Sequence, residues 1–261
     1  MRFTQIKSCF VGPAISPEQY ISEHTFIYIG KGAITGFDGN AQHTLRPGEY
    51  CVMRKNCLVR YNKEKENNEF EKVVIVFDEE FLKRFLDKYK PNREVAVPSD
   101  VFVRLTENTL IPNFVHSLIP YYDGQGKIME TFVDVKREEL MLILLQSQPE
   151  LAGIFFDFGV PEKINLEEFM NHNYRFNVSI ERFAYLTGRS LSAFKRDFRA
   201  IFNETPNRWL IYKRLQEAHF LIAKKQQKSS DIYLDLGFED LSHFSFAFKK
   251  QFGYAPTELA R

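Results

Sequence analysis

The last hundred or so residues of this chain contain one sequence pattern twice. One copy, LSAFKRDFRAIFNETP, starts at Leu191, and the other, LSHFSFAFKKQFGYAP, starts at Leu241. Leu, Ser, three Phe residues and Pro occupy the same offsets in both copies. The Phe residues recur every fourth position, which is the spacing of one face of an α-helix. Self-similarity at a fixed distance predicts a structural unit that the chain builds twice.

Each copy follows a short apolar segment and a glycine, which predicts two short helices joined by a tight turn. In the first copy Ser179 and Ser190 occupy the N-cap positions of the two helices, and Gly188 ends the first helix. In the second copy Gly237 makes the turn and Asp240 takes the position of Ser190. Two short helices joined in this way form a helix-turn-helix, whose second helix fits the major groove of DNA.

The outward faces of the two second helices provide the candidate DNA contacts. Arg and Lys are the commonest readers of guanine, and lysines one turn further along are typical of phosphate contacts. The candidate base contacts are Ser192, Lys195, Arg196, Arg199, Ser242, His243, Ser245 and Phe246. The candidate phosphate or positioning contacts are Arg189, Ser190, Asp240, Lys249 and Lys250.

Some of these residues have a second interpretation. His243 fits a polar residue of the cap region as well as it fits a base contact. Phe246 fits contact with a thymine methyl group, and it fits packing within the fold slightly better. A basic pair such as Lys195 and Arg196 most often lies on a solvated face, but matching outward positions in two copies favour DNA reading.

The segment between the copies, residues 206–225, predicts a long helix. It begins with Pro at a favoured first-turn position and continues with good helix formers. A helix of about 18 residues is roughly 27 Å long. This length is close to the ~34 Å between successive major grooves on one face of DNA. The helix is therefore expected to hold the two reading units in register.

The first part of the chain has a strand pattern. Residues 24–78 alternate between runs of β-branched and aromatic residues and turn residues, which predicts a small β-sandwich or barrel. Helices are expected over 79–90, around 108–119 and over 129–148. The third helix fits a core helix packed on the strands, and a dimer seam is the alternative.

The predicted fold class is α+β with two domains. A cupin-like sheet domain with flanking helices is expected over residues 1–157, and a linker with Gly159 and Pro161 over 158–164. An all-α domain with two helix-turn-helix units is expected over 165–261.

Charge and composition narrow the partners. From Lys163 onward there are 16 Lys and Arg against 11 Asp and Glu, whereas the whole chain has a net charge of +1. A basic C-terminal module fits a polyanion, and surface scatter explains the asymmetry equally well. The N-terminus lacks a signal-peptide pattern, and no segment approaches the ~20 apolar residues that span a bilayer. The three cysteines fit a reducing compartment, so a cytoplasmic location without membrane contact is expected.

Two other functions compete with DNA reading. A metal-dependent cupin enzyme needs clustered imidazoles and a carboxylate, but His24, His43 and His116 are well separated. No catalytic residue, metal or cofactor is therefore expected. The other alternative is a protein-binding module, whose binding would persist at high salt, whereas binding to several DNA phosphates weakens steeply.

The C-terminal region resembles the AraC/XylS family of bacterial transcription regulators. The segments SIERFAYLTGRSLSAFKRDF and DLGFEDLSHFSFAFKKQFGYAPTEL carry the resemblance. It implies a regulator, expected to be an activator, that binds promoter DNA as a homodimer and acts with RNA polymerase. The base contacts it implies are mainly Ser192, Lys195 and Arg196, with Ser242, His243 and Phe246 in the second unit.

The N-terminal region is similar in layout to the cupin-like sensing domain found in part of this family, as in the relatives that control type III secretion. This resemblance implies an effector, either a small molecule or a protein partner. Three residues depart from the family pattern: Asn203 replaces a usual Gly, Tyr233 a usual Ala, and Phe246 a polar or basic residue. These departures imply that the second unit contributes more to positioning than to reading bases.

Overall fold

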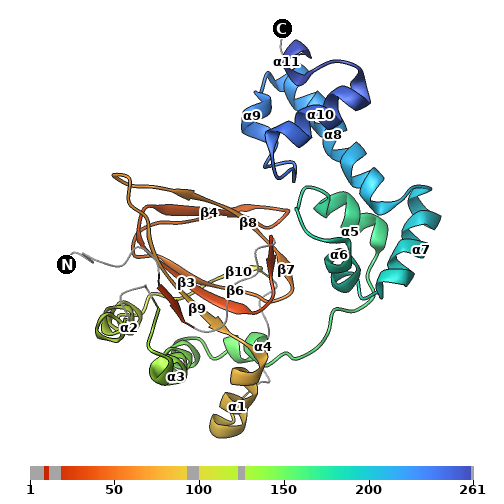
Figure 1. The fold of residues 1–261 in the computed structure, drawn as a ribbon. Helices are drawn as coiled ribbons and strands as arrows, with labels where there is room; N and C mark the ends of the chain where they lie inside the picture. Colours follow the sequence, from red (N-terminus) through yellow and green to blue (C-terminus); the bar gives the residue numbers. More distant parts are fainter. Residues whose placement is uncertain (1–8, 12–18, 93–99, 123–126, 260–261) are drawn as a thin grey trace. The chain divides into compact units, whose positions relative to one another are not determined.

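The computed structural model of the chain describes residues 9–11, 19–92, 100–122 and 127–259 (Figure 1). The chain divides into two compact units, Met1–Gly159 and Val160–Arg261. Among the described residues, the strands lie in the first unit and the second unit is helical, so the predicted α+β class is confirmed. Most of the N-terminal segment in which no signal peptide is predicted lies outside the described residues, as does the Cys9 side chain.

In its described residues, the N-terminal unit contains a five-stranded sheet, a three-stranded sheet and one short strand pair. The larger sheet has the order β1-β9-β3-β6-β10, in which β1 runs parallel to β9 and the other neighbours are antiparallel. The smaller sheet has the order β5-β4-β8, and β2 pairs with β7. The strands are β1 (Cys9–Val11), β2 (Tyr20–Ile21), β3 (His24–Lys31), β4 (Ala33–Phe37), β5 (Gln42–Leu45), β6 (Tyr50–Met53), β7 (Cys57–Leu58), β8 (Arg60–Glu64), β9 (Glu71–Phe77) and β10 (Phe102–Arg104).

The five-stranded sheet is covered on both faces. Along β9, Val74 and Val76 pack between the two sheets, whereas Ile75 and Phe77 pack beneath the helices. Figure 1 shows these helices on the face of the larger sheet that points away from β4 and β8. Because successive residues of a strand point to opposite faces, a strand covered on both sides is buried along its length. All seven residues of β9 are buried, and the last five, Val73 to Phe77, are apolar.

The helices of the N-terminal unit follow the predicted order and nearly the predicted bounds. Asp78 caps α1, and its Oδ1 accepts a hydrogen bond from the Phe81 backbone N–H at 2.9 Å. On α3, Leu140 and Leu144 are buried, so the interpretation as a core helix is confirmed for its second half. The helices are α1 (Glu79–Tyr89), α2 (Leu110–Ser117), the 3-10 helix η1 (Ile119–Tyr121), α3 (Glu130–Ser147) and α4 (Leu151–Phe155).

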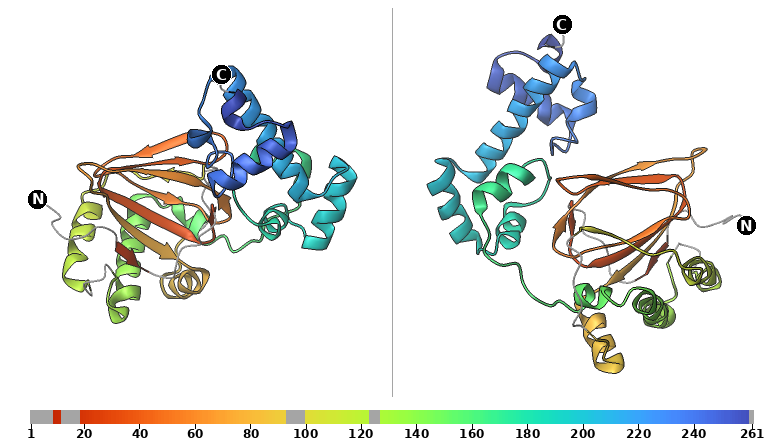
Figure 2. Two further views of the ribbon diagram at one scale, coloured as in Figure 1. Left: turned by 45° about the horizontal axis from the view of Figure 1, so that its top comes forward. Right: turned by 180° about the vertical axis from the view of Figure 1, so that it is seen from behind.

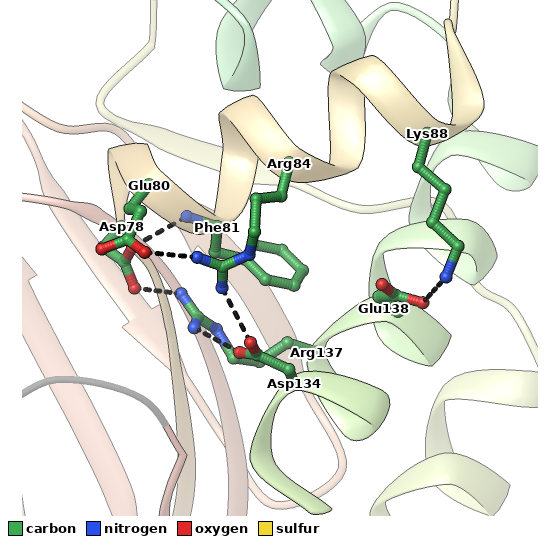
Figure 3. Close-up of polar contacts among 8 residues, drawn as sticks. All are labelled: Asp78, Glu80, Phe81, Arg84, Lys88, Asp134, Arg137 and Glu138. Atoms are coloured by element: carbon green, nitrogen blue, oxygen red, sulfur yellow. Dashed lines mark hydrogen bonds and ion pairs between the residues drawn. The ribbon is translucent and has the colours of Figure 1, made fainter.

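Ion pairs join α1 to α3 (Figure 3). The buried guanidinium of Arg137 donates to Asp78 and, at 2.9 Å, to Asp134, and it lies 4.1 Å from the centre of the Phe81 ring. Arg84 donates to Asp134 at 2.7 Å. Arg137 therefore links the cap of α1 to α3, and a buried charge with such partners is costly to unpair.

The C-terminal unit contains the two copies of the repeated pattern. The second helix of each copy, α7 or α10, has twelve residues, and α8 runs between them as the predicted spacer over Pro206–Lys225. Figures 1 and 2 show α7 and α10 at opposite ends of α8. The helices are α5 (Leu166–Asn173), α6 (Ile180–Leu186), α7 (Leu191–Phe202), α8 (Pro206–Lys225), α9 (Ser229–Ile232), α10 (Leu241–Phe252) and α11 (Pro256–Leu259).

The caps of the two copies are as predicted. The Ser190 hydroxyl accepts from the Ala193 backbone N–H at 3.3 Å, and the Asp240 carboxylate accepts from the His243 N–H at 2.6 Å. At their C-terminal ends, α7 and α10 stop at residues in the left-handed conformation, Asn203 with φ 53° and Gly253 with φ 86°. Asn tolerates this conformation better than most residues, so Asn203 can replace glycine here.

Candidate DNA-binding surface

The first reading helix, α7, separates its side chains into an apolar and a basic face. Phe194 and Phe198 are fully buried, with ring centres 5.6 Å apart. The four candidate base contacts of α7 recur at helical spacing on the opposite face. All of them are exposed: Ser192, Lys195, Arg196 and Arg199.

Arg196 is held in place by its neighbour. Its Nη2 and Nε donate to Oδ1 of Asp197 at 2.9 and 3.1 Å. The hydrogen bond from Arg196 is the main reason that the pKa of Asp197 is lowered. The Arg196 side chain is still 76% exposed, so it is both oriented and within reach of a ligand.

Arg189, by contrast, is occupied by contacts within the fold. Its side chain is 8% exposed and donates to Asp197 at 3.3 Å and to the carbonyls of Thr187 at 2.7 Å and Ile164 at 3.0 Å. These bonds tie the turn before α7 to α7 itself and to the segment before α5. Of the two roles that the sequence allowed for Arg189, the geometry favours positioning over phosphate contact.

The second reading helix, α10, has the same apolar face but few charges on its outer face. Phe246 is 69% exposed, so the interpretation that its ring packs within the fold is wrong for the described part of the chain. The Asp240 carboxylate accepts the His243 backbone N–H, which makes Asp240 the N-cap of α10, and the His243 side chain is exposed. Of the remaining candidates, Ser245 is half-buried, and Ser242, Lys249 and Lys250 are exposed.

The spacer α8 has 20 residues, which corresponds to about 30 Å. Trp209 near its start packs against Phe198 and Phe202 of α7, with ring centres 5.5 and 4.6 Å apart. Ile222 near its end lies in one apolar cluster with Phe244 and Phe248 of α10. Both reading helices are thus anchored on one rigid element.

Comparison with known proteins identifies the family. Residues 24–154, half of the chain, match the family model of the ExsA N-terminal regulatory domain, and residues 183–261 match that of a helix-turn-helix domain. The chain belongs to the AraC/XylS family of transcriptional regulators. As a member of this family it is a DNA-binding regulator of transcription and not an enzyme.

Individual relatives are distant in sequence. The virulence regulon transcriptional activator VirF of Yersinia enterocolitica is 24% identical over 185 residues, which cover 68% of this chain and 68% of VirF. The HTH-type transcriptional regulator ExsA of Pseudomonas aeruginosa is 22% identical over 258 residues, which cover 97% of this chain and 91% of ExsA. Among solved structures, the apo form of a ToxT variant from Vibrio cholerae aligns over 93% of this chain and 90% of its own, with a TM-score of 0.44 and 13% identity.

Arg214, which the sequence did not single out, joins the two helix-turn-helix units within the C-terminal domain. Arg214 of α8 is 8% exposed and donates to the carbonyls of Tyr174 at 2.7 Å, Phe176 at 2.9 Å and Gly237 at 2.9 Å. Burial lowers its pKa to about 10, which leaves it charged at neutral pH. A Cβ at Gly237 would lie 2.6 Å from the Arg175 carbonyl, so the turn needs glycine. The signal in the sequence is an arginine in line with Leu210, Ala218 and Ile222 on the apolar face of α8.

The histidines of the N-terminal unit are engaged separately. His24 is buried, its Nδ1 accepts the Lys55 backbone N–H at 3.3 Å, and burial lowers its pKa to about 3. His43 pairs with Asp38 at 3.0 Å. Among the described residues, no group of three or more His, Cys, Asp or Glu side chains is placed to hold a metal ion. Within the same residues, none of the helices has the length and apolar character needed to cross a membrane.

Proposed function

We propose that this AraC-family protein activates transcription by reading two successive major grooves of double-stranded promoter DNA with each subunit. The observation that carries the proposal is the pair of twelve-residue helices, α7 and α10, held by one spacer of about 30 Å. Successive major grooves on one face of DNA are ~34 Å apart, so the spacer suits this arrangement. The proposed base contacts are Ser192, Lys195, Arg196, Arg199, Ser242, His243, Ser245 and Phe246, and the proposed phosphate or positioning contacts are Arg189, Ser190, Asp240, Lys249 and Lys250.

The first reading helix carries most of the sequence preference in this proposal. The outer face of α7 presents three basic side chains, and Arg pairs with the O6 and N7 atoms of guanine. On α10 the exposed ring of Phe246 suits the methyl group of thymine. Lys249 and Lys250 lie further along α10 and suit phosphates.

The regulatory half of the proposal concerns the N-terminal unit, a cupin-like domain over residues 1–157 that a linker over 158–164 joins to the DNA-binding domain. An effector, either a small molecule or a protein, acts on this unit. The chain works as a homodimer, and α3 offers a seam because its Phe132, Val135 and Leu142 side chains are exposed apolar groups. RNA polymerase is the proposed partner at the promoter, in the cytoplasm. The word activator in the name of VirF supports the sign of regulation.

Selection of genomic DNA fragments by the full-length protein, at several salt concentrations, tests the proposal. The expected result is a shared motif with two half-sites per subunit, centred about 10 base pairs apart. Affinity for that motif should fall with salt by about 0.9 log unit per log unit of salt for each phosphate neutralised. Binding that lacks any motif and survives high salt would support the protein-binding alternative instead.

A further inference from the structure

A groove with a volume of about 850 Å³ runs along α8 between the two reading helices. The end of α7 borders it with Asn203, and α10 borders it with Phe246 and Lys250. Arg208 and Trp209 of α8 also line it. Three of the α10 residues that line it, His243, Phe246 and Lys250, are proposed DNA contacts, so the groove is continuous with the proposed DNA-binding surface.

The lining combines a basic rim with an apolar floor. The Arg208 side chain is 78% exposed and Lys250 is exposed, whereas Trp209 and Leu215 are almost fully buried. A ligand that suits this lining has anionic groups at its edge and an apolar body. The deoxyribose-phosphate chain of DNA has both.

We propose that the groove holds the stretch of DNA backbone that separates the two major grooves, and that Arg208 binds a phosphate of that stretch. This inference rests on the proposed function. When α7 and α10 lie in successive major grooves, the intervening backbone has to pass between them along α8. Lys250 approaches from the α10 side and Arg208 from the α8 side, so the two cations flank the same path. Arg208 thereby adds a phosphate contact from the spacer helix itself.

A carboxylate beside Arg208 competes with the phosphate. Arg208 Nε lies 3.5 Å from Oε2 of Glu204, in a solvent-exposed ion pair. The other oxygen of Glu204 accepts the Thr205 backbone N–H at 2.8 Å, which fixes the carboxylate at the start of α8. Exposed ion pairs are weak, so a phosphate can displace Glu204 from Arg208. In this proposal Glu204 therefore opposes DNA binding.

Salt titrations of full-length variants on the selected motif test this assignment. Arg208→Ala should lower the salt slope by about 0.9, so its loss of affinity should be about 3.5-fold larger at 50 mM than at 200 mM salt. Glu204→Gln keeps an oxygen for the Thr205 N–H but removes the competing charge, so it should bind more tightly than wild type. Lys224→Ala is the matched control, since Lys224 is an exposed cation of the same helix that does not line the groove.

Duplexes with a single uncharged methylphosphonate linkage locate the contact. A linkage between the two half-sites should weaken wild type, and it should not weaken Arg208→Ala any further. An unchanged salt slope for Arg208→Ala, or equal losses for both proteins at every linkage, would overturn the inference. If this happens while wild type keeps its motif and Arg196→Ala relaxes it, only the assignment of the groove fails. If wild type shows neither a motif nor a salt slope, the proposed function fails as well.

Discussion

Replacing Arg214 by methionine is expected to destabilise the C-terminal unit by about 3 kcal/mol. The carbonyls of Tyr174 and Gly237 lose their hydrogen bond from Arg214, and an unsatisfied buried acceptor costs about 1–3 kcal/mol. The Phe176 carbonyl keeps a second hydrogen bond, from the Val178 N–H at 3.2 Å. The variant no longer has to bury a charge, which offsets part of the loss.

Urea denaturation followed by tryptophan fluorescence measures this loss. Trp209 is the single tryptophan of the chain, it lies on α8, and it is almost fully buried, so its emission reports on the unit that Arg214 holds together. With a denaturant slope of about 2 kcal/mol per molar urea, a loss of about 3 kcal/mol lowers the midpoint by roughly 1.5 M. The slope itself should not change.

Two variants serve as controls. Arg208→Met changes an exposed arginine of the same helix and should move the midpoint by no more than about 0.25 M, which corresponds to about 0.5 kcal/mol. Arg214→Lys should not restore stability, because one ammonium group lacks the planar fork with which Arg214 reaches three carbonyls. A midpoint for Arg214→Met that matches that of Arg208→Met would refute the role given to the buried guanidinium.

Arg196→Ala should cost about 1–3 kcal/mol in DNA binding and relax base preference at one position, whereas Lys250→Ala should weaken binding to all sequences alike. Quantitative binding to single-base variants of the motif separates the two outcomes. Burial opposes ionisation of Asp78, but the hydrogen bonds from Phe81 and Arg137 keep the pKa of Asp78 below its usual value. The ionised Asp78 therefore stabilises the fold above about pH 4, and this stabilisation is lost as the pH falls through the folded-state pKa. The melting temperature of Asp78→Asn should therefore fall less between pH 6 and pH 2 than that of wild type. An equal fall for both proteins would contradict this account. Ser190→Ala should cost about 0.5–2 kcal/mol through loss of the α7 cap, while Ser192→Ala on the solvent face should have almost no effect on the urea midpoint.

Local patterns in the sequence predict the helical unit well. The apolar period, the N-cap residues and Pro206 together locate α7, α8 and α10, because the signals that begin and end a helix lie within a few residues of its ends. The side chains expected on the outer face of α7 are exposed because the apolar period fixes which face is buried. Asn203 could be recognised as a helix end because few residues adopt its left-handed conformation easily.

Contacts between distant residues are what the sequence does not reveal. In the sequence Arg189 cannot be distinguished from an exposed cation, because its partner, the Ile164 carbonyl, is brought to it by the fold. Arg214 interrupts the apolar face of α8 because it bonds distant carbonyls, such as those of Phe176 and Gly237. The order of strands in the larger sheet is a similar case, since β1 pairs with β9 although β2 to β8 lie between them in the sequence. For Phe246 the sequence predicts a contact that is absent among the described residues: an aromatic side chain is expected to pack within the fold, but this one is exposed to solvent.

From the shortness of α9 we expect the two reading units to differ in rigidity. It has four residues where α6 has seven, so few of its backbone amides are bonded within the helix. Ile232 and Leu236 hold this segment by packing, while Leu234 between them is 52% exposed. Segments with few internal hydrogen bonds open first, so the amides of α9 should exchange with solvent faster than those of α6. The first reading unit is then the more rigid one, and the more flexible second unit can accommodate half-sites whose spacing departs from the ideal.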